Sequence, residues 1–167
     1  PLEPRILRSK IRFFLELDEQ KKRLAATEER FRSTFENAAV GIAHVALDGR
    51  WIRMNPKFRE ILGLAPYMRV ERSFIDTIHP EGLETDIDAI NRLLSGALAS
   101  YSVERRLLRR DATYIWVMLN VSVIRGLGGQ IDDLIVSAQD ISVLKEAKEA
   151  AESANRALTP DEVTNHD

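Results

Sequence analysis

Cysteine is absent from the 167 residues of this chain. Its absence excludes disulfides, thiolate nucleophiles, cysteine-ligated metals and photochemistry that forms a thiol adduct. Long apolar runs are missing as well. No run approaches the roughly 18 residues that a membrane span needs, and there is no signal-peptide pattern. We therefore expect a soluble protein in the cytoplasm that does not engage a membrane.

A strong excess of charge of one sign is also missing. The chain has 24 basic and 26 acidic residues, which gives a formal charge of -2 at pH 7. Nucleic-acid-binding domains are usually strongly basic, so we expect no nucleic-acid partner. The length favours one domain with appendages over two full domains.

Three runs of alternating apolar and polar residues dominate the second half of the chain. The alternation predicts antiparallel strands, because strand side chains point to opposite faces in turn. Turn-forming residues separate the runs at Arg110-Asp111-Ala112 and at Gly126-Leu127-Gly128-Gly129. The runs cover residues 101–109, 113–125 and 131–139. A helix is expected from Asp140 to about Ala157, with Asp140 as its N-cap because a carboxylate can accept the free N–H groups of the first turn.

The middle run is apolar on both faces. One face carries Ile115, Val117, Leu119, Val121 and Val123, and the other carries Tyr114, Trp116, Met118, Asn120 and Ser122. A sheet with bulky residues on both sides needs two covers. We expect helices of the same domain on one side. A flanking helix or a partner chain is expected on the other, because exposed apolar patches usually mark interfaces.

Residues 4–37 are predicted to form one long helix with an apolar heptad seam. Its a and d positions hold Leu7, Phe14, Leu17, Leu24, Phe31 and Phe35. Lys10, Lys21 and Glu28 interrupt this seam. A two-chain coiled coil, and hence a homodimer, is the expected use of such a seam. The alternative is a helix that lies on its own domain.

Shorter elements are expected between the long helix and the three strands. Asn55-Pro56 should start a helix because Asn caps helices and Pro fits the first helical position. An amphipathic helix should place Leu83, Ile87, Ile90 and Leu94 on one face before Gly96 ends it. The other expected elements are strands at 41–46 and 51–54, a stop at Gly63 and a single helical turn at 74–78.

The opening residues resemble the end of a bacterial response-regulator receiver domain. The similarity rests on residues 1–10 and on Phe13-Phe14-Leu15-Glu16-Leu17. In that family a lysine-proline pair closes the last strand, and the final helix follows. The resemblance implies a phosphorylatable receiver upstream in the parent protein.

Residues 28–142 resemble a PAS domain, the small sensory module of bacterial signalling proteins. The matching pieces are Leu47-Asp48-Gly49-Arg50, Met54-Asn55-Pro56-Lys57-Phe58, Ile78-His79-Pro80-Glu81, residues 101–107, Tyr114-Ile115-Trp116-Val117 and Asp140-Ile141-Ser142. Their order and spacing together are specific. One departure is Ala112, which stands where the family usually has the glycine of an Asp-Gly turn.

The resemblance implies an α+β fold with a five-stranded antiparallel sheet and helices on one face. The second strand should lie beside the first, and the fifth between the first and fourth. A long N-terminal helix and a C-terminal linker helix should flank the domain. The expected organisation is a receiver-derived linker helix at 1–27, the PAS domain at 28–142, a signalling helix at 143–158 and a flexible tail at 159–167.

No cofactor is expected. Flavin photoreceptors of this family need a cysteine, and Ala138 stands where they have a polar amide. Haem needs an axial ligand, usually His. His44, His79 and His166 all lie outside the helix from which haem-binding relatives supply theirs. The histidines also lack the spacing of a metal site, and no catalytic constellation is present, so we expect no enzyme activity in these residues.

An apolar pocket between sheet and helices is the expected ligand site. Arg105 shares its strand face with Val103 and Leu107, so its guanidinium needs a carboxylate partner or an anionic ligand, unless it reaches solvent along its stem. The expected pocket residues are Met54, Phe58, Leu62, Ile75, Leu94, Arg105, Leu107, Val117, Leu119, Val136 and Ala138.

These features favour a regulatory dimerisation module that passes conformational change between its flanking helices. The resemblance implies that Asp140, Ile141 and Ser142 couple the sheet to the outgoing helix. The expected dimer and helix interface consists of Phe14, Leu17, Leu24, Tyr114, Trp116 and Met118. The output would be a diguanylate cyclase, signalled by Asn165-His166-Asp167, or a histidine kinase, signalled by residues 150–157. The alternative is a receptor for an organic acid or another small molecule.

Overall fold

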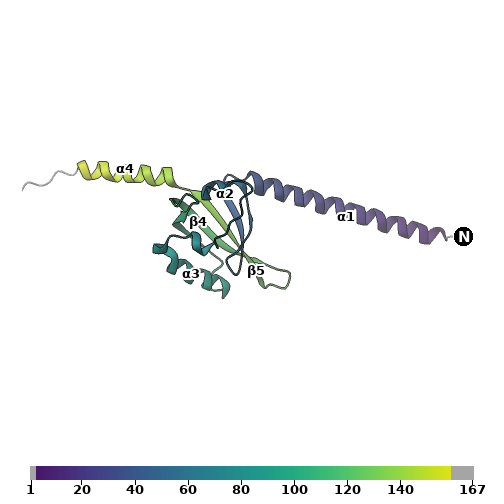
Figure 1. Cartoon of the computed structure of the whole chain (residues 1–167). Helices are drawn as coiled ribbons and strands as arrows, with labels where there is room; N and C mark the ends of the chain where they lie inside the picture. Colours follow the sequence, from purple (N-terminus) through teal and green to yellow (C-terminus); the bar gives the residue numbers. More distant parts are fainter. Residues whose placement is uncertain (1–2, 159–167) are drawn as a thin grey trace, which may run out of the picture. The chain divides into compact units, whose positions relative to one another are not determined.

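The computed structural model describes residues 3–158 and divides the chain into two units that meet at Ala38 and Ala39. The first unit is helix α1 (Pro4–Asn37), which is unbroken over 34 residues (Figure 1). Pro4 lies in its first turn, where a missing N–H leaves no hydrogen bond unmade. The prediction of one helix over 4–37 is confirmed. The expected tail at 159–167 lies outside the described residues.

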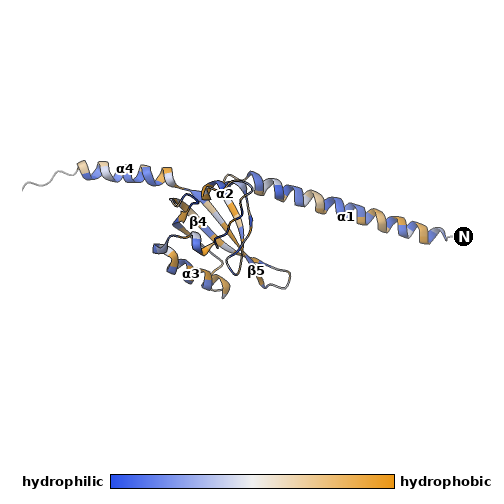
Figure 2. Ribbon diagram, viewed as in Figure 1, coloured by the Kyte–Doolittle hydropathy of each residue, from blue (hydrophilic) through white to orange (hydrophobic). Residues whose placement is uncertain are grey.

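The surface of α1 is amphipathic and mostly exposed. Figure 2 shows apolar and polar residues interspersed along it. Large apolar side chains stand in solvent in the single chain, among them Phe14 at 68% and Leu24 at 62% exposure. Phe35 is the buried residue of this helix. None of the helices in the described part of the chain has the length and apolar content to cross a bilayer.

The second unit is built on a five-stranded antiparallel sheet with the order β2-β1-β5-β4-β3. This order confirms the expected placing of the fifth strand between the first and fourth. The strands are β1 (Gly41–Ala46), β2 (Trp51–Met54), β3 (Ser100–Leu108), β4 (Tyr114–Arg125) and β5 (Ile131–Asp140).

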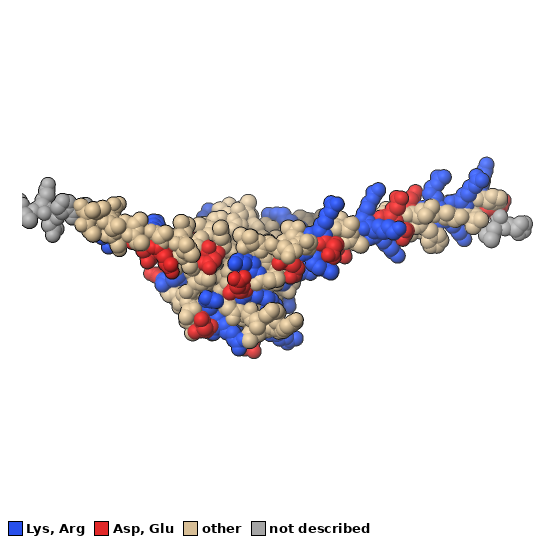
Figure 3. Space-filling model, turned by 90° about the horizontal axis from the view of Figure 1, so that it is seen from above, with Lys and Arg blue, Asp and Glu red and all other residues tan. Residues whose placement is uncertain are grey.

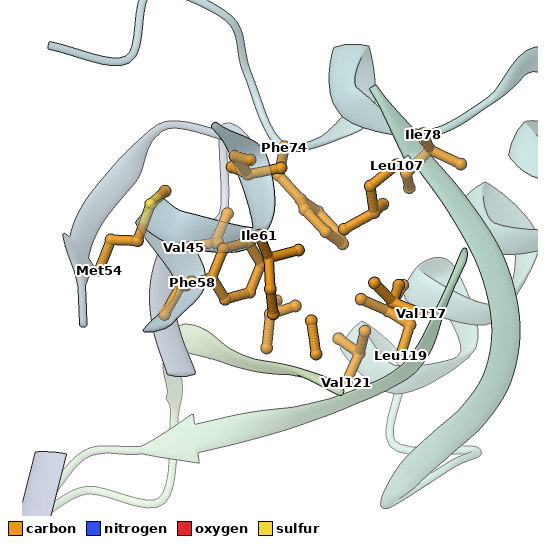
Figure 4. Packing of buried hydrophobic residues seen from close by; sticks show 14 of the residues in the cluster. Val45, Met54, Phe58, Ile61, Phe74, Ile78, Leu107, Val117, Leu119 and Val121 are labelled. Atoms are coloured by element: carbon orange, nitrogen blue, oxygen red, sulfur yellow. The ribbon is translucent and has the colours of Figure 1, made fainter. Parts of the chain in front are cut away.

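One face of the sheet forms the core. The alternation in β4 is borne out, because Val117, Leu119 and Val121 are fully buried and their neighbours in sequence point to the other face. Helix α2 (Pro56–Leu62) contributes Phe58 and Ile61. Side chains from the sheet and the helical segments point toward one another and fill this interior (Figure 4).

Local sequence sets both ends of α2 as predicted. The Asn55 side chain accepts from the Phe58 N–H at 2.9 Å and is itself buried. Asn55 also accepts from Ile42 N and donates to Val40 O. Gly63 ends the helix with a φ of 72°, a conformation that glycine adopts without a side-chain clash. The capping residue therefore also fixes α2 to the start of β1.

Helix α3 (Pro80–Leu94) begins earlier than expected, and its buried face is shifted. It follows the short 3-10 turn η1 (Ile75–Thr77). Its N-cap is His79, whose ring accepts from Glu81 N. The buried positions are Asp86 and Leu93, whereas Ile87 and Leu94 are 41% and 37% exposed. The expected stripe was therefore wrong by about one position at these two sites.

The turn between β3 and β4 holds an alanine in a left-handed backbone conformation. Ala112 has a φ of 66°, and it is the only non-glycine residue with positive φ among those described. Ala112 N donates to Arg109 O, and Arg109 N donates to Thr113 O. Asp111 Oδ1 accepts from Thr113 N at 3.0 Å. These bonds hold Ala112 in the left-handed conformation, which is unfavourable for a residue with a Cβ.

Replacing Ala112 by glycine should stabilise the domain by about 0.5–1 kcal/mol. The left-handed backbone costs a residue with a Cβ roughly 1–2 kcal/mol, and the extra entropy of glycine in the unfolded chain offsets about 0.4–1 kcal/mol of the relief. Urea denaturation measures the difference. Ala89→Gly, at a helical position in α3, should shift stability in the opposite direction. Equal losses in both variants would contradict the strain at Ala112.

Candidate functional site

The junction between β5 and α4 (Ser142–Leu158) is where the sheet passes into the outgoing helix. Only Ile141 separates the two elements, and it is 6% exposed. Ile141 N donates to Trp116 O at 3.0 Å, and Lys145 N donates to Ile141 O. The backbone of Ile141 therefore extends the β4–β5 pairing and also begins the helix.

The Asp140 carboxylate stabilises the first turn of α4, although Asp140 lies one residue before the N-cap position. Its Oδ1 accepts from Ser142 N at 2.9 Å. Since α4 begins at Ser142, Ile141 precedes its first residue, and the expectation that Asp140 is the N-cap was wrong. The carboxylate still satisfies a free N–H at the positive end of the helix. Asp140 also pairs with Val117 in the sheet register.

A side-chain contact, which we call the latch, ties α4 to the outer face of the sheet. It consists of Lys145, Glu104 and Trp116. The Lys145 ammonium forms an ion pair with the Glu104 carboxylate and lies 4.3 Å from the centroid of the Trp116 ring. Arg106 lies 5.4 Å from the same centroid. The latch therefore combines an ion pair with cation–π contacts across β3, β4 and α4.

The latch depends on the charge of Glu104. The hydrogen bond from Lys145 lowers the pKa of Glu104, burial opposes this, and the Lys145 and Lys148 charges reinforce it. A carboxyl group with a lowered pKa in the folded state is charged at neutral pH. Its contribution to stability is lost as the pH falls through that lowered value. Glu104 is consequently charged at neutral pH, as its ion pair with Lys145 requires.

The outer face of β4 holds the remaining expected interface residues. Tyr114 and Met118 are 43% and 36% exposed, and Trp116 between them is half-buried. The Tyr114 ring packs edge-on against His79 at 4.6 Å. The start of α4 thus covers the centre of this face and leaves its flanks open.

Most of the expected pocket residues lie in the interior of the domain. There they pack against one another and do not line an open pocket. Met54, Phe58, Leu62, Leu107, Val117, Leu119, Val136 and Ala138 belong to the buried core, and Ile75 packs against it. Leu94, by contrast, is 37% exposed, so its place in a pocket was wrong. Side chains that fill an interior leave it closely packed.

Arg105 has a carboxylate partner within the chain. Its Nε donates to Asp86 Oδ2 at 2.8 Å, and the two side chains are 17% and 1% exposed. Gly82 allows this approach, because a Cβ there would lie 2.5 Å from Arg105 Nε. Burial raises the pKa of the nearby Tyr101 phenol, and the Asp86 charge adds to this. Asp86 thus supplies the anion that Arg105 requires.

The histidines have structural surroundings. His79 caps α3. Burial and the Arg53 charge lower the pKa of His44, against the Asp133 charge. His166 lies outside the described residues. Within residues 3–158 there is no group of three or more potential ligands arranged to hold a metal ion.

Sequence reasoning missed Asp86, Glu104 and Lys145. Asp86 had a usable signal, because it lies three residues after Leu83 and four before Ile90, on the apolar stripe of its helix. A charge on such a stripe predicts a buried partner. Glu104 and Lys145 carry no comparable signal, because their contact depends on the path of the chain after β5.

Comparison with known proteins identifies the domain. A family model described as PAS fold matches residues 29–141. The "Probable diguanylate cyclase DgcE" of Escherichia coli (strain K12) is 28% identical over 140 residues, which are 84% of this chain and 13% of that protein. The "Sensor histidine kinase TmoS" of Ectopseudomonas mendocina is 29% identical over 133 residues, which are 80% of this chain and 13% of that protein.

A solved structure shows the same fold. The sensory box histidine kinase/response regulator from Burkholderia thailandensis E264 has a TM-score of 0.61 at 19% identity. The match covers 77% of this chain and 97% of that chain. This chain spans 13% of the length of each of these two curated relatives.

Proposed function

The chain belongs to the PAS family, and we propose that it relays conformational change from an input at α1 to an output domain after α4. It is a regulatory sensor module of signalling proteins, like the regions it matches in a probable cyclase and a sensor kinase. The observation that carries the relay is the junction, where the last strand and the outgoing helix share Ile141. A small shift of β5 then re-aims α4.

The latch supports this proposal. Lys145 lies on the second turn of α4, and its two contacts reach Glu104 on β3 and Trp116 on β4. A movement of any of these strands changes the support of the helix. Packed contacts of this kind pass strain between sites by rearranging instead of deforming continuously.

We propose that α1 derives from the last helix of a receiver domain and carries the input. The resemblance covers residues 1–17, of which Pro1 and Leu2 lie outside the described residues. Phosphorylation of an upstream receiver would then reach the PAS domain along this helix. The continuity of α1 from Pro4 to Asn37 supports it, because an unbroken helix transmits rotation and displacement along its length.

A homodimer through α1 is the second part of the proposal. Phe14 and Leu24 are mostly exposed in the single chain, and they share the heptad seam with Leu17. Side chains of both charges, Lys and Arg in blue and Asp and Glu in red, stand along α1 with uncharged residues between them (Figure 3). An exposed apolar seam flanked by charge is what a two-chain coiled coil uses. The outer-face residues Tyr114, Trp116 and Met118 are proposed as a separate dimer contact on the sheet unit.

Replacing Leu17 and Leu24 together by glutamate should convert the chain to a monomer. Each buried leucine contributes roughly 1.5–3 kcal/mol, so the dimer dissociation constant should rise by about 100-fold or more. Sedimentation equilibrium measures it. Leu15→Glu is the control, because Leu15 is 61% exposed and lies off the seam. A dimer that survives the double change, or no wild-type dimer at all, would refute this interface.

The output domain is proposed to be a diguanylate cyclase or a histidine kinase. Both kinds occur among the relatives, and residues 165–167, which favour the cyclase, lie outside the described residues. The test of the relay is the output activity of the full-length protein after Asp140→Ala. The substitution should leave the domain folded while its output no longer follows its input.

A further inference from the structure

A cleft of about 350 Å³ opens between the loop after α2 and the end of β3. Four of its lining residues are Arg69, Arg72, Arg109 and Arg110, which we call the arginine cleft. Glu71 is the one acidic residue of the lining, and leucine, valine, methionine and the threonine Thr77 complete it. Two arginine pairs, separated by nearly forty positions in sequence, thus meet at one opening.

The walls of the arginine cleft are fixed by backbone acceptors. Arg59 Nη1 donates to Met68 O at 2.9 Å, and Trp51 Nε1 donates to Arg72 O at 2.9 Å. Arg110 N donates to Leu62 O at 2.9 Å, which joins the end of β3 to the end of α2. The cleft is therefore formed before any ligand arrives, and preorganised sites lose less entropy on binding.

The guanidinium groups are short of anionic partners. Glu71, the carboxylate of the lining, forms no ion pair with them among the described residues. Two further carboxylates accept bonds within their own turns: Asp76 accepts from Ser73 and Asp111 accepts from Thr113. Asp111 also experiences the charge of Arg109. Even so, Arg109 Nε is buried and has no hydrogen-bond acceptor among the described residues. A buried donor without an acceptor is unfavourable, and like charges gathered around it add repulsion.

We propose that the arginine cleft binds a compact organic anion with at least two negative charges on phosphate or carboxylate groups. Planar guanidinium groups match both kinds of oxyanion and can bind them with paired hydrogen bonds. The volume is at the low end for small-molecule sites, which favours a ligand of metabolite size. Leu64 and Val70 would contact its carbon skeleton. The cleft borders the packed core at Leu62, and its lining includes no residue of the junction or of the latch.

Calorimetric titration of the whole chain with pyrophosphate and with citrate tests the site. At low salt the wild type should bind at least one of these probes, and added sodium chloride should weaken the binding. Arg109→Gln should raise the dissociation constant about tenfold or more, as the loss of a charge-assisted hydrogen bond predicts. Arg92→Gln is the matched control, because this arginine is exposed on α3 away from the cleft.

Arg69→Gln keeps the test decisive if Arg109→Gln impairs folding. Arg69 is exposed on the loop, so its loss should weaken binding without unfolding the domain. Binding of pyrophosphate alone would assign a phosphate ligand, and binding of citrate alone a polycarboxylate. No heat from either probe with folded wild type would overturn the proposal. So would equal affinities in Arg69→Gln, Arg109→Gln and Arg92→Gln.

Discussion

Replacing Asp86 by alanine should lower the free energy of unfolding by about 3 kcal/mol. The substitution leaves the Arg105 guanidinium without its carboxylate, while Gly82 and the strand still hold it in place. Removal of one member of a buried ion pair typically costs about 3–5 kcal/mol. The lower end applies because Arg105 is 17% exposed and can partly regain water. Urea denaturation followed by circular dichroism measures the loss.

Two further variants separate the ion pair from general damage to α3. Asp88→Ala removes an exposed carboxylate from the same helix and should change stability by less than about 0.5 kcal/mol. The double variant Asp86→Leu with Arg105→Met replaces both charges by apolar groups and should recover most of the loss. If Asp86→Ala lowered the free energy of unfolding no more than Asp88→Ala does, the Asp86–Arg105 ion pair would not contribute to stability.

Asp140→Ala should loosen the first turn of α4 while leaving the sheet intact. The lost hydrogen bond to Ser142 N and the lost charge at the helix start together cost about 1 kcal/mol. Amide hydrogen exchange should therefore accelerate about fivefold in residues 142–146. Exchange in β4 and β5 should change little, because Ile141 N still bonds Trp116 O.

The control for Asp140 lies on the same strand. Asp132 is an exposed carboxylate of β5 at the end remote from α4. Asp132→Ala should leave exchange in α4 unchanged. Faster exchange throughout the sheet after Asp140→Ala would indicate general destabilisation in place of a local role at the junction.

The sheet could be predicted from sequence because its signals are local. Alternation over 113–125 assigned the faces of β4, since each side chain's direction follows from its position in the strand. Asn55, Pro56 and Gly63 likewise specify both ends of α2 through bonds within a few residues. The strand order did not follow from such signals, and it came from the resemblance to a family.

Features that depend on contacts between distant elements could not be predicted in the same way. The buried face of α3 includes Asp86 because Arg105, on the facing strand, neutralises it. Apolar spacing alone instead favoured Ile87 and Leu94. Lys145 presents the same difficulty, because only the exit of α4 beside Trp116 makes it more than a solvated lysine. The features that the sequence did not predict, the buried Asp86 and the contacts of Lys145, therefore both depend on charge interactions between elements that are distant in the sequence.

We propose that β5 passes its displacement into α4 through the junction at Ile141, where the Asp140 carboxylate holds the first turn of the helix. The most direct measurement is the output activity of the full-length protein, with and without its input, in Asp140→Ala and Asp132→Ala. We expect the ratio of the two activities to fall to about one in Asp140→Ala and to keep its wild-type value in Asp132→Ala. A wild-type ratio in a folded Asp140→Ala protein would contradict it.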